Sequence, residues 1–125
     1  MRVPVLALIA CIGVTAGADV ALARSTGRGR YCQTIVVPVG RGSGHERWKV
    51  YRVGGSCAEA KRVLEGYQTT TLAYARAGKC LGSTCVNAPQ PPGFRCSSST
   101  AGGEAQTGHI TTCRGHGAVY RDYSR

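Results

Sequence analysis

Two stretches near the start of the chain have the residue pattern of β-strands. Tyr31 to Val39 is rich in β-branched residues around Ile35-Val36-Val37, and Pro38 limits it to a strand end or a sheet edge. After the glycine-containing loop 40–44, Arg47 to Val53 alternates basic and apolar side chains. This alternation predicts a half-buried strand with Trp48, Val50 and Val53 close to the core and a charged opposite face.

The stretch from Gly54 to Glu65 predicts the main helix of the protein. Ser56 is suited to cap the first turn, and Glu59, three residues later, is suited to reach back to the Ser56 amide in a capping box. Apolar residues follow at helical spacing, namely Cys57, Ala60, Val63, Leu64 and Tyr67. The segment 72–76 either continues this helix or forms a second short one before Gly78.

The second half of the chain reads as short strands joined by loops. Residues 79–92 form an excursion rich in turn residues, a strand follows at 93–97, and 98–108 reads as a polar loop. Two further strands, 109–114 and 118–123, flank a glycine turn and predict a hairpin. The predicted fold class is therefore α+β: a small disulfide-bonded domain over residues 31–125, with one main helix packed on an antiparallel sheet.

The first 23 residues have the composition of a secretory signal peptide. A short positive start, Met1-Arg2, precedes the apolar run 3–14 and two small-residue cleavage sites, the second ending at Ala23. Leu8-Ile9-Ala10-Cys11 also has the pattern of a bacterial lipoprotein box, which leaves lipid anchoring at Cys11 as a minor alternative. We therefore expect a secreted or extracytoplasmic protein with no stable membrane span after cleavage, beginning with a flexible basic tail at 24–30.

Six cysteines lie beyond the predicted signal peptide: Cys32, Cys57, Cys80, Cys85, Cys96 and Cys113. An even number in a short exported chain indicates a disulfide framework, although six cysteines permit 15 pairings. The close pair Cys80 and Cys85 predicts a local disulfide, and we expect the other four to form two links between helix and sheet. Cys57 opens the helix and could instead be a reactive thiolate, but a structural disulfide is the favoured interpretation.

The formal charge of +10 predicts attraction to anionic partners. The candidate partners are an anionic envelope polymer, a nucleic acid or an acidic protein. The candidate contact residues are Arg47, Lys49 and Tyr51 on one strand face, with Arg52 adjacent, because basic and aromatic side chains together bind phosphates and stack on rings. A merely solvated strand face is the alternative. The oligomeric state is left open.

The sequence contains few candidates for catalysis or metal binding. Acid/base chemistry would have to use His45 with Glu46, or His109 with His116, and each histidine lies beside or near glycine, as in an exposed loop. His109, Cys113 and His116 have spacings that could bind zinc, but oxidation of Cys113 would remove that ligand. We therefore predict no catalytic residue, no metal and no cofactor.

Three segments together resemble a known group of proteins. They are Ser56 to Val63, then Gly93-Phe94-Arg95-Cys96, and finally Cys113-Arg114-Gly115. In these segments the chain resembles small exported actinobacterial proteins with a cysteine at the start of a helix and a final cysteine-containing hairpin. The resemblance implies export and a disulfide-bonded α+β domain, and it implies no catalytic residue.

These observations favour a non-enzymatic binding module that acts at the cell envelope or outside the cell. The alternative is a small secreted hydrolase such as a ribonuclease. A secreted protease inhibitor or a small antimicrobial protein fits the cysteines and charge equally well, but no motif supports it.

Overall fold

The computed structural model describes residues 27–39 and 44–125. The predicted signal peptide with Cys11, the first residues of the predicted basic tail (24–26) and most of the first loop (40–43) lie outside the described residues.

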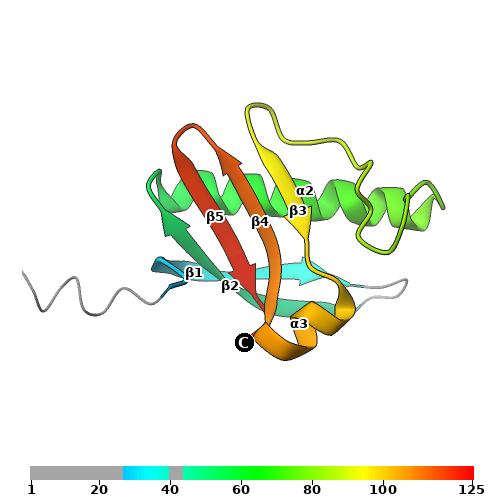
Figure 1. Cartoon of the computed structure of the whole chain (residues 1–125), viewed down its shortest axis with the longest axis horizontal. Helices are drawn as coiled ribbons and strands as arrows, with labels where there is room; N and C mark the ends of the chain where they lie inside the picture. The colour runs from blue at the N-terminus through cyan, green and yellow to red at the C-terminus, as the bar shows by residue number, and fades with distance from the viewer. Residues whose placement is uncertain (1–26, 40–43) are drawn as a thin grey trace, which may run out of the picture.

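Five strands form one antiparallel sheet in the order β1-β2-β5-β4-β3 (Figure 1). The strands are β1 (Arg30–Pro38), β2 (His45–Val53), β3 (Arg95–Ser98), β4 (His109–Gly115) and β5 (Ala118–Tyr123). The main helix, α2 (Cys57–Arg76), follows β2, and a short helix, α3 (Ala101–Thr107), precedes β4. The predicted α+β fold class is confirmed.

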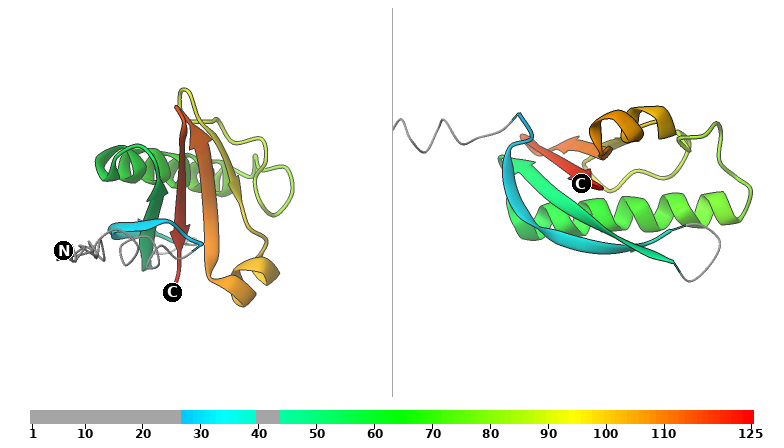
Figure 2. Two further views of the ribbon diagram at one scale, coloured as in Figure 1. Left: turned by 60° about the vertical axis from the view of Figure 1, so that its left-hand side comes forward. Right: turned by 90° about the horizontal axis from the view of Figure 1, so that it is seen from below.

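The helix α2 crosses one face of the sheet and closes the core (Figure 2). Its buried side chains are Ala60, Val63, Leu64 and Tyr67, and they belong to the same cluster as Ile35, Trp48, Val50 and Tyr120 of the strands. Burial of a side chain of this size contributes about 1.5–3 kcal/mol relative to leaving it exposed. The opposite face of the sheet is not crossed by α2, and α3 lies at one end of the sheet, beside the start of β4 (Figures 1 and 2).

The helix α2 continues without a break for 20 residues. The threonines at 69–71 are poor helix formers, but the hydroxyls of Thr70 and Thr71 donate to the carbonyl oxygens of Gly66 and Tyr67. Tyr74, one turn further on, packs against the core. Packing of this last segment therefore outweighs its weak helix propensity.

Two local predictions were wrong. Val53 does not lie in the core but is 50% exposed. Side chains alternate between the two faces of a strand, so Val53 points to the face opposite that of Trp48 and Val50. The segment 98–108 is not only a loop, since it contains α3. Thr100 caps that helix by accepting from the Gly103 amide, and Gly108 ends it in the left-handed conformation.

Three disulfides hold the domain together: Cys32–Cys57, Cys80–Cys85 and Cys96–Cys113. The local Cys80–Cys85 pairing is confirmed, and Cys32–Cys57 links β1 to the start of α2 as expected. The second predicted helix-to-sheet link was wrong, because Cys96 and Cys113 lie directly opposite each other on β3 and β4. Only Cys57 of those four cysteines lies on a helix, so the remaining pair had to join two strands.

Candidate functional site

The face of the sheet that points away from α2 carries a group of cations. Strand alternation and register place five basic side chains on it, four of them exposed and Arg121 partly so. We call this surface the basic face, defined by Arg47, Lys49, Arg95, Arg114 and Arg121.

Three of these cations form a diagonal stripe across neighbouring strands. Arg114 of β4 lies opposite Val119 of β5. Arg121, two residues after Val119, points to the same face and is therefore the diagonal neighbour of Arg114; we call side chains that lie directly opposite one another across the strands a row, so Arg121 is one row further along. Arg121 in turn lies opposite Tyr51, so Lys49 of β2 is one row further again. Diagonal neighbours in an antiparallel sheet are about 7–8 Å apart. Arg95, opposite Arg114, and Arg47, the next outward residue after Lys49, extend the stripe at its two ends.

Tyrosines lie beside the stripe. The rings of Tyr31 and Tyr51 meet edge to face with centroids 5.5 Å apart, and Tyr51 meets Tyr123 in the same way at 5.4 Å. Tyr123 is buried, whereas Tyr31 is 54% exposed. The guanidinium of Arg28 lies 4.1 Å from the centroid of Tyr123 and 5.8 Å from that of Tyr51, and it donates to the carbonyl oxygen of Arg125.

The strand positions of the basic face include no carboxylate. The acidic residues of the described ranges lie elsewhere: Glu59 and Glu65 on α2, Glu104 on α3, and Glu46 and Asp122 at strand positions that point to the α2 side of the sheet. Glu46 accepts a hydrogen bond from the indole of Trp48 at 2.9 Å. The positive charge of this face is therefore not balanced by acidic side chains within it, which favours an anionic partner.

His109 lies on the same face at the start of β4. One ring nitrogen contacts the hydroxyl of Ser99 at 2.8 Å and the other that of Thr112 at 2.7 Å. Burial lowers the pKa of His109, a hydrogen bond with the Thr111 backbone opposes this shift, and the positive charge of Arg121 adds to it. The neutral imidazole therefore acts as a polar packing group beside Tyr123, with ring centroids 5.3 Å apart.

The predicted contact residues divide between the two faces of β2. Arg47, Lys49 and Tyr51 lie together on the basic face. Arg52 lies on the other face, and its guanidinium donates to the carbonyl oxygens of Gly54 and Gly55. Five further residues of this surface were not predicted as contact residues, although each lies on a predicted strand: Arg95, Arg114, Arg121, Tyr31 and Tyr123. The missing information was the strand order, which brings these positions to one surface.

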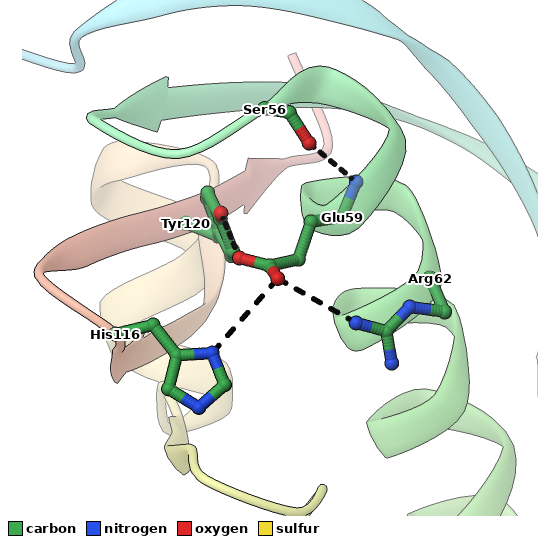
Figure 3. A network of polar contacts seen from close by, with 5 residues as sticks. All are labelled: Ser56, Glu59, Arg62, His116 and Tyr120. Carbon is green, nitrogen blue, oxygen red and sulfur yellow. Dashed lines mark hydrogen bonds and ion pairs between the residues drawn. The ribbon is translucent and has the colours of Figure 1, made fainter.

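A second polar cluster joins the start of α2 to the β4–β5 hairpin (Figure 3). The hydroxyl of Ser56 accepts from the Glu59 amide at 3.1 Å, which confirms the predicted cap. The Glu59 carboxylate does not bond to the Ser56 amide as predicted. It accepts from the Tyr120 hydroxyl at 2.5 Å and lies 3.6 Å from Arg62 and 3.9 Å from a ring nitrogen of His116.

The backbone of this region explains how the cluster is held. The two-residue turn of the hairpin places His116 and Gly117 at φ values of 51° and 72°, as a type I′ turn requires. Gly55 has a φ of 59°, and a side chain there would collide with the Tyr120 phenol. Burial raises the pKa of Tyr120, and the hydrogen bond to Glu59 adds to the shift. The neutral phenol therefore donates to the carboxylate and links the helix to the sheet.

The histidine pairs considered for catalysis are not brought together. His109 begins β4 and His116 follows its last residue, so the length of the strand separates them. His45 and Glu46 are consecutive on β2 and point to opposite faces. Cys113, the third residue of the zinc hypothesis, forms a disulfide with Cys96. Within residues 27–39 and 44–125, no three His, Cys, Asp or Glu side chains are grouped so that they could hold a metal ion.

No protein-family model, curated protein or solved structure matches the chain. In the part of the chain that the structure describes, no helix has both the length and the apolar character needed to span a membrane.

Proposed function

We propose that this protein is an exported binding module that holds anionic polymers on its basic face. The observation that carries the proposal is the stripe of Arg114, Arg121 and Lys49 on a sheet face whose strand positions include no carboxylate. A regular row of cations is complementary to a chain of regularly spaced negative charges.

The disulfides and the charge support the same setting. Three disulfides in a domain of this size are typical of proteins that fold in an oxidising, extracytoplasmic compartment. Export through the segment 1–23 would place the module where envelope polymers, nucleic acid released from cells and acidic proteins are accessible. The positions of the histidines are consistent with a non-enzymatic role. His109 is the histidine on the basic face, and its ring contacts the hydroxyls of Ser99 and Thr112 rather than an acidic side chain.

The test compares two triple variants with equal charge changes. Lys49→Gln/Arg114→Gln/Arg121→Gln removes the stripe, whereas Lys61→Gln/Arg62→Gln/Lys79→Gln removes three cations from α2 and the loop after it. Binding of labelled inorganic polyphosphate is followed by fluorescence anisotropy over a series of salt concentrations. If polyphosphate follows the log–log salt slope of single-stranded nucleic acids, about 0.7 per contact, loss of three contacts weakens binding about 100-fold at 0.1 M salt.

The control variant should bind nearly as tightly as the wild type if the stripe is the site. Equal weakening in both variants would show that only net charge matters and would contradict a specific face. No binding of polyphosphate by the wild type at low salt would exclude the proposal altogether.

The alternative is a small secreted hydrolase such as a ribonuclease. The observation in its favour is that the Glu59 carboxylate, which is partly exposed, lies near both Arg62 and His116 and accepts from the Tyr120 hydroxyl. Degradation of RNA by the oxidised protein, and its loss in His116→Ala but not in His45→Ala, would support this alternative. Equal rates in the wild type and both variants would exclude it.

A further inference from the structure

We propose that the ligand of the basic face is single-stranded nucleic acid, with phosphates along the cationic stripe and a base stacked on Tyr31. This inference rests on the proposed function, because it names the class of anionic polymer that the same face would bind.

The positions of rings and charges relative to each other carry the inference. Arg121, Tyr51 and Tyr31 occupy one side-chain row on three neighbouring strands. Neighbouring strands are about 4.8 Å apart, so the strand position of Tyr31 lies about 10 Å from that of Arg121. Lys49, the next cation of the stripe, is the diagonal neighbour of Tyr31 on the adjacent strand β2. A single-stranded nucleic acid has the same arrangement, with charges along a backbone and flat rings displaced to one side of it.

Tyr31 is held as a stacking surface before any ligand arrives. Its hydroxyl is hydrogen-bonded to that of Thr34 at 3.0 Å, and its ring meets that of Tyr51 in a T-shaped contact. Little side-chain entropy is then lost on stacking, which favours affinity. Since 54% of the residue remains exposed, the side chain is accessible for contact with a base.

The contact made by Arg28 shows that the rings of Tyr51 and Tyr123 can stack with a planar group. Its planar guanidinium lies over the buried Tyr123 and partly over Tyr51. This residue also adds a cation between the tyrosines and the chain terminus, where Arg28 donates to the Arg125 carbonyl. Arg28 therefore adds a positive charge over the rings of Tyr123 and Tyr51, on the side of Tyr31 where the stripe lies.

The same geometry distinguishes single strands from other polyanions. In a duplex the bases are paired and stacked on each other, so their faces are not available to Tyr31. Acidic proteins and polyphosphate supply charge, but they do not supply a flat ring at each charged repeat. Stacking accepts every base, so we expect little sequence preference.

The experiment measures binding of four labelled probes to the oxidised protein at one salt concentration. The probes are a 12-nucleotide single-stranded DNA, an abasic strand of the same length, the corresponding duplex, and a poly(glycerol phosphate) chain of matched charge. We expect the single strand to bind about 5- to 150-fold more tightly than the abasic strand, which is the range measured for one stacked base.

Variants of Tyr31 test the stacking directly. Tyr31→Leu should reduce binding of the single strand by the same factor and leave binding of the abasic strand unchanged. Tyr31→Trp should restore binding and report it by quenching of the new indole. The matched control is Val36→Ala on the same strand and face, where the side chain is similarly exposed at 56%. Circular dichroism and the absence of free thiols verify the fold of each variant.

The outcomes separate the two proposals. If the abasic strand or the poly(glycerol phosphate) binds as tightly as single-stranded DNA, the inference is overturned while the proposed function stands. If the duplex binds best, stacking on Tyr31 is likewise excluded. If none of the four probes binds, both proposals fail.

Discussion

At the scale of single residues, Asp122 is an unusual carboxyl group because its side chain is fully buried. It accepts from the Thr111 amide at 2.8 Å and lies 3.5 Å from the amide nitrogen of Gln68. Burial raises its pKa from 3.8 to about 7, and the hydrogen bonds from Thr111 and Gln68 limit the shift. The folded protein therefore holds a proton here that the unfolded chain has already lost at mildly acidic pH.

This shift predicts that part of the stability is lost as pH rises from about 4 to about 7. The raised pKa means that the folded state binds more protons than the unfolded state within this window, so the free energy of unfolding falls with pH. Each pKa unit corresponds to about 1.4 kcal/mol, and the total is a few kcal/mol. Asp122→Asn should flatten this dependence in urea unfolding at pH 4.5 and 7.5, whereas Glu65→Gln on the accessible surface of α2 should retain it. An unchanged slope in Asp122→Asn would refute the assignment.

At the scale of elements, the start of α2 depends on one side chain for its cap. Ser56 has an extended backbone and its hydroxyl satisfies the Glu59 amide, which would otherwise lack a partner in the first turn. The Glu59 side chain is then free to accept from Tyr120 and so to fix the helix to β5. The cap was predictable from the sequence because it is local. The contact with Tyr120 was not, because 61 residues separate the partners.

We predict that Ser56→Ala lowers the free energy of unfolding by about 1 kcal/mol. Thr69→Ala, an exposed position within the same helix, should instead raise it by a few tenths of a kcal/mol because alanine has the higher helix propensity. Chemical denaturation of both variants checks the pair. A loss below about 0.3 kcal/mol for Ser56→Ala would mean that water replaces the cap.

At the scale of the whole molecule, the disulfides close loops of different length. Cys32–Cys57 spans 25 residues and ties the edge strand β1 to α2, whereas Cys80–Cys85 spans 5 residues within one loop. A longer closed loop removes more conformational entropy from the unfolded chain. The helix-to-strand link therefore matters more for the domain as a whole.

Removing the two disulfides separately should show this difference. Cys32→Ala/Cys57→Ala is expected to cost about 3–4 kcal/mol, and Cys80→Ala/Cys85→Ala about 2 kcal/mol, from loop length. Thermal unfolding of the two double variants beside the wild type provides the measurement. A larger loss for the short loop would show that local packing around Cys85, which is buried, dominates over chain entropy.

The sequence by itself determined the features that depend on neighbouring residues. Strand alternation in Arg47 to Val53, the Ser56 cap, the hairpin around Gly115-His116-Gly117 and the Cys80–Cys85 pair all follow from short-range spacing. The fold class followed from the order of these elements. The prediction for Val53 failed although strand alternation already placed it on the face opposite Trp48 and Val50. The prediction for the segment 98–108 failed because its polar, glycine-containing sequence resembles a loop.

Only the tertiary structure decided which distant residues share a surface. The strand order β1-β2-β5-β4-β3 inserts the last hairpin beside β2, so Arg114 and Arg121 join Lys49 on one face, and Cys96 meets Cys113. Such contacts depend on pairing between strands far apart in the chain, which no local pattern of side chains specifies.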